Sequence, residues 1–159
     1  MKLIVSYAPR REATVNQLLR RQRELLSVAS VYYSKSYADE WNATAIGTVP
    51  LAVDIASLRR FSPLSTLNRK LRFYTSEAVA EAICSSDAPA YQAAKLWTRK
   101  ECIFKLCGQR NPFPAEMIYN EDDFITVGTY RIHTLRLTEQ LLLSVLYDTA
   151  TWSYSKIAQ

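Results

Sequence analysis

The chain has 159 residues, of which 48% are hydrophobic and 22% are charged, and its formal net charge is +5 at pH 7. This length and composition are typical of one globular domain and exclude an intrinsically disordered chain. No run of 18 apolar residues occurs, so the sequence predicts no membrane-spanning helix. The three glycines are too few to favour the glycine-rich phosphate loops of P-loop and Rossmann proteins.

The cysteines and the first residues indicate a cellular compartment. Cys84, Cys102 and Cys107 form no CxxC pair, and His133 is the single histidine, which argues against a zinc site. Free thiols are typical of a reducing cytosol. Residues 3–5 do not begin a signal-peptide pattern. We therefore expect a cytoplasmic protein that has no membrane partner.

The first predicted elements are strands and one helix. Residues 2–7 predict a strand, and residues 11–27 predict an amphipathic helix with a basic polar face. Residues 29–36 predict a second strand. We expect a polar turn at residues 37–42 and a short strand around residues 44–46 to follow it.

The middle of the chain contains an apolar run that is interrupted by one charged residue. Residues 51–56 (LAVDIA) predict a strand buried on both faces, and Asp54 is its one polar residue. Residues 57–72 are basic and are predicted to be partly helical. Ser76 is expected to cap a helix that extends to about Ile83.

The clearest predicted helix covers residues 91–107 and ends at Gly108, with prolines shortly after it. Residues 117–119, 124–137 and 141–147 predict strands, the last two as a hairpin. Hydrophobicity alternates only loosely in these strands, so the pattern does not define their register.

Asp54 and one face of the long helix are the candidate functional positions. A buried, ionised aspartate is costly unless a cation or hydrogen bonds compensate it, so Asp54 has either a structural or a functional role. Trp97, Glu101 and Lys105 are four residues apart and share a helix face. Glu101 and Lys105 form either an ordinary surface pair or, if Glu101 approaches Asp54, part of a two-carboxylate site suited to Mg²⁺. Lys100 and Lys105 would then supply positive charge to ligand phosphates.

Four segments of the chain are similar to the motifs of one known family. Its strand motif, close to (V/I)-G-(V/I)-D-(I/V)-E, is similar to residues 51–56. Its helix motif, close to (F/W)-(S/C/T)-x-K-E-(A/S)-x-x-K, is similar to residues 97–105 (WTRKECIFK). Residues 72–77 (RFYTSE) and 33–36 (YSKS) resemble its R-F-F-(T/S)-x-E and S-H-S segments. From about residue 31 to 147 the chain thus resembles the 4′-phosphopantetheinyl transferase superfamily, of the holo-acyl-carrier-protein synthase type.

This resemblance implies transfer of 4′-phosphopantetheine from coenzyme A to a serine of an acyl or peptidyl carrier protein, with 3′,5′-ADP as the second product. Asp54 and Glu101 would bind Mg²⁺, which bridges the pyrophosphate of coenzyme A. Glu101, or a water that it holds, is a candidate base for the serine. Lys105 would stabilise the charge that develops on the leaving phosphate, and Lys100 would assist it.

The same resemblance implies further contacts with the ligand and the partner. Ser34 and Lys35 would lie where the family binds the 3′-phosphate of coenzyme A. An acidic carrier protein is the expected macromolecular partner, and nucleic acid is not expected. A group of basic residues is either its docking surface or an ordinary solvated face: Arg59, Arg60, Arg69, Lys70 and Arg72.

The resemblance also implies an α+β fold, in which an antiparallel three-stranded sheet packs on a long helix. We expect one domain over residues 1–159, with a shortened N-terminal half at residues 1–48 and a C-terminal half at residues 49–148 that carries the motifs. Longer members of the family contain two such halves in a pseudo-twofold relation and bind coenzyme A between them.

Three positions depart from the family pattern. Ala56 stands where longer members often have a third acidic ligand, Ala52 replaces the glycine of the strand motif, and Lys35 replaces a histidine. A second interpretation is therefore a degenerate member that binds coenzyme A or a carrier protein without turnover. A nucleic-acid-binding protein is a third interpretation, but the interleaved aromatics typical of one are lacking. The sequence leaves open the carrier protein, the oligomeric state, and whether fatty acid, polyketide or peptide synthesis is served.

Overall fold

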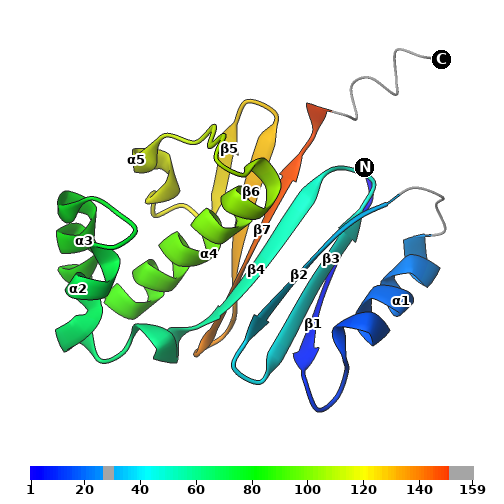
Figure 1. Cartoon of the computed structure of the whole chain (residues 1–159), viewed down its shortest axis with the longest axis horizontal. Helices are drawn as coiled ribbons and strands as arrows, with labels where there is room; N and C mark the ends of the chain where they lie inside the picture. The colour runs from blue at the N-terminus through cyan, green and yellow to red at the C-terminus, as the bar shows by residue number, and fades with distance from the viewer. Residues whose placement is uncertain (27–30, 151–159) are drawn as a thin grey trace.

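The computed structural model describes residues 1–26 and 31–150, and its strands form two antiparallel sheets (Figure 1). The first sheet is built from β1 (Leu3–Pro9), β2 (Tyr32–Ala38) and β3 (Trp41–Gly47), with α1 (Val15–Leu26) between β1 and β2. Its strand order is β1-β3-β2. The predicted strands and helix of this part are confirmed, but the helix begins at Val15 and not at residue 11. The predicted ends at residues 27, 29 and 30 lie outside the described residues.

The turn between β2 and β3 is tighter than the sequence predicts. The expected polar turn covers residues 37–42, whereas β2 continues to Ala38 and β3 begins at Trp41. Asp39 has a φ of 47°, in the left-handed region that aspartate tolerates better than most residues. A two-residue turn of Asp39 and Glu40 therefore joins the strands.

The second sheet has the order β4-β7-β6-β5, and helices cover one of its faces (Figure 1). Its strands are β4 (Leu51–Ser57), β5 (Phe124–Val127), β6 (Tyr130–Thr138) and β7 (Leu141–Asp148). The helices of this part are α2 (Leu67–Leu71), α3 (Glu77–Cys84), α4 (Pro89–Cys107) and α5 (Ala115–Ile118), preceded by two 3₁₀ turns, η1 (Leu58–Phe61) and η2 (Leu64–Thr66).

Local capping signals predicted the two long helices of this part correctly. The Ser76 hydroxyl accepts a hydrogen bond from the Val79 amide at 3.4 Å and caps α3. Gly108 ends α4 with a φ of 60°, a conformation that is costly for residues with a side chain. The long helix therefore has the predicted end and begins two residues before its predicted start.

Two predictions for the segment after α4 are wrong. The expected strand at residues 117–119 is a helical turn, because the Met117 and Ile118 amides donate to the Pro114 carbonyl. So short an apolar run does not distinguish a strand from a helix. The expected strand at residues 124–137 is two strands that turn at Gly128. The sheet consequently has four strands, where three were expected.

The two sheets share one connectivity, although no repeat is visible in the sequence. In the first sheet, the chain passes from β1 through α1 to β2, and β3 returns between β1 and β2. In the second, it passes from β4 through α4 to β6, and β7 returns between β4 and β6. The first sheet with α1 is therefore a smaller arrangement of the same connectivity as the second sheet with α4.

Apolar side chains on opposite faces of β4 belong to two separate clusters. One cluster packs under α4 and includes Ala52, Ala56, Ile132, Leu142 and Leu146. The other lies between the sheets and includes Ala43, Ala45, Val53, Ile55 and Leu143. Even-numbered residues of β4 thus face α4, as the twofold periodicity of a strand requires.

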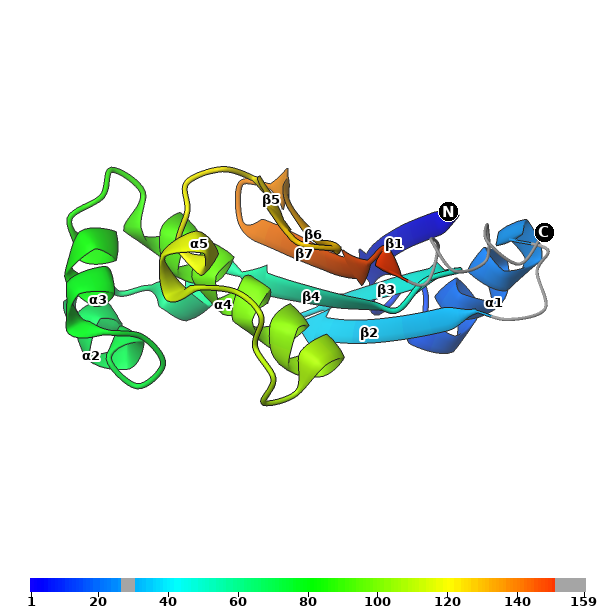
Figure 2. The ribbon, with the colours of Figure 1, turned by 90° about the horizontal axis from the view of Figure 1, so that it is seen from above.

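Strand β2 runs beside β4, so the edges of the two sheets meet (Figure 2). This junction brings the first sheet against the strand that carries Asp54. Within residues 1–26 and 31–150, no helix has the length and apolar character needed to cross a membrane.

Candidate active site

Serine hydroxyls join the two sheets at their adjacent edges. The Val53 amide donates to Ser34 Oγ at 3.0 Å, and the Ile55 amide donates to Ser36 Oγ at 3.3 Å. Because β4 is an edge strand, these amides have no ladder partner within their own sheet. The two serines of β2 thus satisfy backbone donors that would otherwise be unpaired.

Asp54 is buried at this junction and is held by two side chains from different elements. Its side chain is 7% exposed, and its Oδ1 atom lies 2.7 Å from Lys105 Nζ. Ser36 Oγ donates to the same oxygen, also at 2.7 Å. Lys105 Nζ further donates to the Val53 carbonyl at 3.0 Å. The cation that the sequence requires for a buried Asp54 is therefore Lys105 of α4.

Burial and these partners have opposite effects on the Asp54 carboxyl. Burial raises the pKa of Asp54 and outweighs the attraction of Lys105 and the hydrogen bonds from Lys105 and Ser36, which lower it. The nearby Arg60 also lowers it. The positive charges thus favour the ionised form of Asp54, which a bound cation would need, whereas burial disfavours that form.

Glu101 lies one helical turn before Lys105 on α4 and is partly buried. Residues four apart share a helix face, so Glu101 is on the side of α4 from which Lys105 reaches Asp54. Throughout the described residues, no group of three or more His, Cys, Asp or Glu side chains is arranged to hold a metal ion. Asp54 and Glu101 belong to β4 and α4, which pack against each other, and Ala56 on the same face of β4 has no oxygen ligand to add.

A second group of motif residues surrounds Trp97. Lys100 Nζ donates to the Tyr74 carbonyl, and the Tyr74 ring stands edge-on to the Trp97 ring at 5.2 Å between centroids. The Arg60 guanidinium lies 4.1 Å from the centre of the Trp97 ring. Burial lowers the pKa of Lys100. The segment at residues 72–77 is therefore in direct contact with the helix motif.

A pocket of about 320 Å³ opens beside this group. It is lined by Arg60, Phe61, Lys70, Phe73, Tyr74 and Trp97. Arg60 belongs both to this pocket and to the electrostatic surroundings of Asp54. The sequence predicts Arg60 only as a docking residue, because its place in the site depends on its long-range packing against Trp97.

Ser34 and Lys35 do not meet at one ligand position. Ser34 faces β4, whereas Lys35, the next residue of the strand, lies on the opposite face and is exposed. Lys35 lines pockets together with residues of α1. The structure therefore brings Asp54 and Lys105 together, adds Ser36 as a partner that the sequence does not predict, and separates Lys35 from them.

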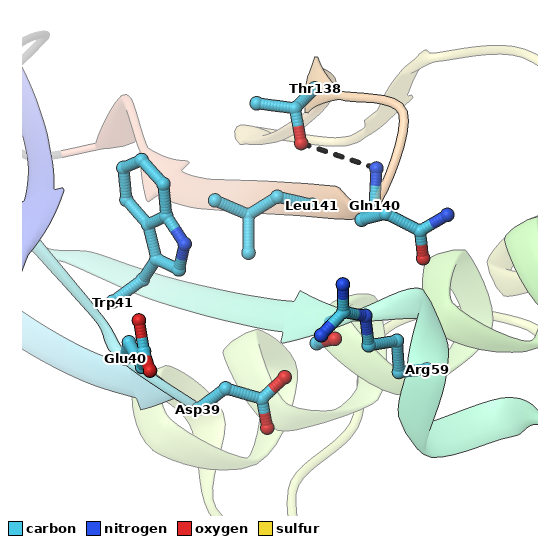
Figure 3. Close-up of a pocket in the computed structure, with 8 residues that line it drawn as sticks. Asp39, Glu40, Trp41, Arg59, Thr138, Gln140 and Leu141 are labelled. Atoms are coloured by element: carbon cyan, nitrogen blue, oxygen red, sulfur yellow. Dashed lines mark hydrogen bonds between the residues drawn. The ribbon is translucent and has the colours of Figure 1, made fainter.

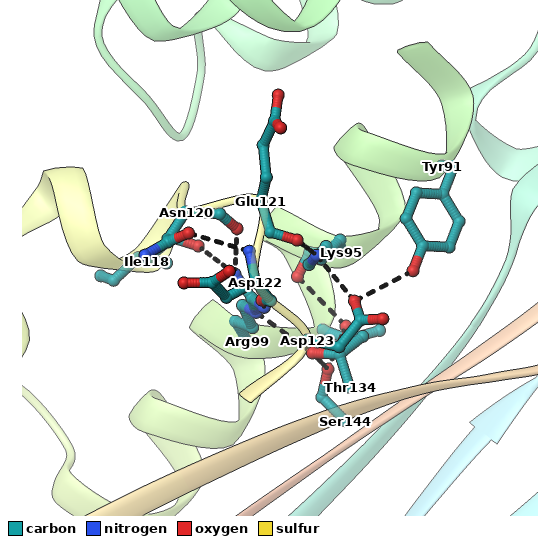
Figure 4. A network of polar contacts seen from close by, with 11 residues as sticks. Tyr91, Lys95, Arg99, Ile118, Asn120, Glu121, Asp122, Asp123, Thr134 and Ser144 are labelled. Atoms are coloured by element: carbon teal, nitrogen blue, oxygen red, sulfur yellow. Dashed lines mark hydrogen bonds and ion pairs between the residues drawn. The ribbon is translucent and has the colours of Figure 1, made fainter. Parts of the chain in front are cut away.

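A buried polar network fixes α4 to the loop before β5 (Figure 4). Arg99 is fully buried, and its guanidinium donates to Thr134 Oγ1 at 3.1 Å. It also donates to the carbonyls of three loop residues: Ile118, Asn120 and Asp122. Burial lowers the pKa of Arg99 to about 10, so the guanidinium is charged at neutral pH.

The same network includes a second buried cation and reaches the site strand. Lys95 Nζ lies 2.8 Å from Asp123 Oδ1, to which the Tyr91 hydroxyl also donates at 3.2 Å. Thr134 contacts Ser144, and Ser144 pairs with Asp54 in the register of β7 and β4. The network thus sets the position of α4 relative to β4, and with it the distance between Lys105 and Asp54.

Another pocket, of about 210 Å³, lies where the β2–β3 and β6–β7 turns approach the end of β4 (Figure 3). Trp41, Arg59 and the acidic residues Asp39 and Glu40 are among its lining residues. No residue that the motifs select lines it, so it is not part of the candidate active site.

Comparison with known proteins identifies the family. The family model of the 4′-phosphopantetheinyl transferase superfamily (ACPS) matches residues 50–154, which include the strand of Asp54 and the whole of α4. No curated protein matches the chain. The matched region covers well over half of the sequence, and the chain belongs to the 4′-phosphopantetheinyl transferase superfamily.

Proposed function

We propose that this protein is a Mg²⁺-dependent 4′-phosphopantetheinyl transferase with holo-acyl-carrier-protein synthase activity, which modifies a serine of an acyl or peptidyl carrier protein. Its family supports phosphopantetheine transfer in general. The observation that carries the proposal is the contact of Lys105 with Asp54, which joins the helix motif to the strand motif and leaves Glu101 one turn away.

Asp54 and Glu101 would hold the magnesium ion. Mg²⁺ is commonly bound through one or two carboxylates, with waters and substrate phosphates as the remaining ligands. Two carboxylates without a third acidic residue fit that mode of binding, in which phosphate oxygens of coenzyme A would complete the coordination shell of the ion. The ion would supply positive charge to the pyrophosphate of coenzyme A.

The side chains of α4 would carry out the proton and charge transfers. The carrier serine oxygen forms a bond to the phosphorus that bears pantetheine, and the bond from that phosphorus to the oxygen of the departing 3′,5′-ADP breaks. Glu101, or a water that it holds, accepts the serine proton. Lys105 stabilises the charge on the leaving phosphate, and Lys100 assists in binding coenzyme A.

The basic surface near Trp97 would receive the acidic carrier protein. Arg72 is engaged with Glu77 at 2.6 Å, and Lys70 donates to the Arg60 carbonyl at 3.2 Å. Arg59 and Arg69 form no ion pair within the described part of the chain. Phe73 is 84% exposed and lines the pocket beside Trp97, together with Arg60 and Lys70. Positive charge around an exposed aromatic ring suits an acidic partner with an apolar contact.

We further propose that residues 1–159 act as one unit in the cytoplasm, with residues 1–48 as the N-terminal half and residues 49–148 as the half that carries the motifs. The contact of Ser36 with Asp54 supports this division, because the first half then contributes a residue to the site in the second. Fatty acid synthesis is one pathway in which such a carrier protein serves.

The second candidate function is an accessory protein that binds coenzyme A or a carrier protein without turnover. One observation favours it: Ala56 is 3% exposed beneath α4, at the place where a third carboxylate would stand. Asp54 is in addition already paired with Lys105. Both candidates predict binding of coenzyme A, and they differ in transfer.

Calorimetric titration of coenzyme A, with Mg²⁺ and with EDTA, tests the binding that both candidates require. We expect Mg²⁺ to strengthen binding to the wild type, and Asp54→Asn to remove that effect. Asp87→Asn is the matched control, because Asp87 is exposed and outside the site. Mg²⁺-dependent binding followed by transfer to a carrier supports the transferase, and binding without transfer supports the accessory protein. If the affinity for coenzyme A changes neither with Mg²⁺ nor in Asp54→Asn, the proposed site is wrong.

A further inference from the structure

The hydroxyl of Ser36 makes two hydrogen bonds to the strand that carries Asp54. The Ile55 amide donates to Ser36 Oγ at 3.3 Å, and Ser36 Oγ donates to Asp54 Oδ1 at 2.7 Å. A serine hydroxyl has one proton to donate, and an ionised carboxylate can only accept. The amide therefore occupies the acceptor side of the hydroxyl, and the proton of Ser36 is directed to Asp54. Ser36 is buried, so these contacts are shielded from water.

Both side-chain partners of Asp54 bind the same carboxylate oxygen. Lys105 Nζ and Ser36 Oγ each lie 2.7 Å from Oδ1, and within the described residues no hydrogen bond reaches Oδ2. In the same part of the chain, the buried side-chain atoms that lack a partner are Gln22 Oε1 and Thr44 Oγ1, so the unbonded Oδ2 atom is not enclosed. Asp54 thus has one oxygen held by the protein and one open to a ligand.

The two donors to Oδ1 respond differently to a cation. The ammonium group of Lys105 is repelled by a positive charge that approaches Asp54, whereas the hydroxyl of Ser36 is neutral. The Lys105 side chain is 29% exposed and can turn toward solvent, but Ser36 is fixed through the Ile55 amide to the strand of Asp54 itself. Ser36 is therefore the donor that stays on Oδ1 if Lys105 moves away.

We propose that Ser36 is a positioning residue for the metal ligand Asp54, because its hydrogen bond holds Oδ1 and leaves Oδ2 free for a divalent cation. Partners of metal ligands in other proteins typically contribute about 10–100-fold to metal affinity. The inference rests on the proposed function, since that reaction requires the cation at Asp54. The first sheet then acts on the site of the second through a side chain that touches no substrate.

Ser34 offers a matched comparison on the same strand. Its Oγ atom accepts a hydrogen bond from the Val53 amide at 3.0 Å, just as Ser36 accepts one from Ile55. Within the described residues, however, Ser34 makes no hydrogen bond to Asp54. A purely structural role at the sheet junction is therefore common to both serines, whereas a role in metal binding through Asp54 belongs to Ser36.

Titration of the full chain with Mn²⁺, without coenzyme A, tests the inference, and the electron paramagnetic resonance signal of the free ion reports binding. Mn²⁺ prefers the same oxygen ligands as Mg²⁺. Ser36→Ala should raise the Kd for Mn²⁺ about tenfold. Ser34→Ala should leave this Kd unchanged, and Ser36→Thr, which keeps the hydroxyl, should restore most of the affinity. Urea midpoints in EDTA should fall in both alanine variants, because each leaves an amide of β4 without its acceptor.

If Ser36→Ala does not fold, Ser36→Cys replaces it, because a thiol is a weak hydrogen-bond donor, and the same rise in Kd is expected. An unchanged Kd in the folded variant, or an equal rise in Ser34→Ala, would overturn the inference.

Transfer to a carrier protein is measured separately, so that the two proposals can fail independently. Transfer by the wild type, with an unchanged Kd for Mn²⁺ in Ser36→Ala, contradicts the role of Ser36 alone. Mn²⁺ binding that depends on Ser36, without transfer to any carrier, supports that role and contradicts the proposed transferase. Wild-type protein that binds no Mn²⁺, or binds it equally well in Asp54→Asn, contradicts both the role of Ser36 and the proposed metal site.

Discussion

Lys105 Nζ lies 2.7 Å from Asp54 Oδ1, and this pair connects helix α4 to strand β4. The lysine side chain is 29% exposed and the aspartate side chain is 7% exposed. Asp54 is therefore buried, and Lys105 lies at the solvent-facing side of the pair. A magnesium ion at Asp54 would take over the charge compensation that Lys105 provides. The ammonium group would then be free to approach a phosphate.

Lys105→Met should lower the free energy of unfolding by about 2 kcal/mol, because Asp54 is left buried without its cation. This is less than the effect for a fully buried pair, since Lys105 is partly exposed. Urea denaturation near pH 7 measures the change. The double variant Asp54→Asn/Lys105→Met should recover part of the loss, and equal midpoints for the wild type and Lys105→Met would show that the pair does not stabilise the fold.

Arg99→Met should destabilise the protein by about 4 kcal/mol, because three backbone carbonyls and the Thr134 hydroxyl lose a buried charged donor. Arg110→Met, at an exposed arginine just after α4, is the control and should change stability by less than about 0.5 kcal/mol. Denaturant titration compares the variants. Similar losses in both would mean that the guanidinium network adds little beyond surface charge.

The acid limb of the stability curve should depend on Asp123. Partial burial alone would raise the pKa of Asp123, but the hydrogen bond and charge of Lys95, with Tyr91, lower it below 3.8. The carboxylate therefore stabilises the folded state above about pH 3.8, and this contribution is lost as pH falls through the lowered pKa. Because Asp123 is largely exposed, Asp123→Asn should cost only about 1 kcal/mol near pH 7.

Unfolding free energies at neutral and acidic pH test this dependence. The difference between the wild type and Asp123→Asn should shrink as pH falls below 3.8 and through the lowered pKa of Asp123. Asp122→Asn is the neighbouring control, since its side chain lies outside the ion pair with Lys95. If the difference in unfolding free energy stays constant with pH, the effect of Asp123 does not arise from its charge.

Ala56→Asp should make the fold more responsive to magnesium. Ala56 lies two residues after Asp54 on the face of β4 that packs under α4. The new carboxylate is buried, so the variant should be less stable than the wild type in EDTA. Saturating Mg²⁺ should restore about 2–3 kcal/mol at a concentration a hundred times Kd. Thermal denaturation with EDTA and with Mg²⁺ measures both effects, and the response should disappear in Ala56→Asp/Asp54→Asn.

Local signals in the sequence were sufficient for most of the fold. The Ser76 cap and the Gly108 end are decided by residues within one turn, so they are visible in the sequence. The helical turn after Pro114 was missed because three apolar residues have no distinctive period. The matching connectivity of the two sheets was missed because pairing of distant strands is a tertiary property.

Sequence alone points to the site only at a residue whose type is unusual for its surroundings. An ionised Asp54 in an apolar strand requires compensation, so the sequence singles it out. Lys105 is predicted from the sequence as a phosphate-binding residue, and its contact with Asp54 is visible only in the structure. Ser36 and Arg60 were not selected, because a serine on an edge strand and an arginine after a strand are ordinary in sequence. Their roles arise from the meeting of β2 with β4 and the packing of Arg60 on Trp97, which involve long-range contacts.

A transfer reaction followed by mass spectrometry of the carrier protein tests whether this protein is a phosphopantetheinyl transferase. The reaction contains the wild-type protein, Mg²⁺, coenzyme A and an apo carrier protein, and Glu101→Gln replaces the wild type in the control. We expect the carrier to gain one phosphopantetheine arm with the wild type and none with folded Glu101→Gln. No gain with the folded wild type across several acyl and peptidyl carriers, or an equal gain with Glu101→Gln, would contradict it.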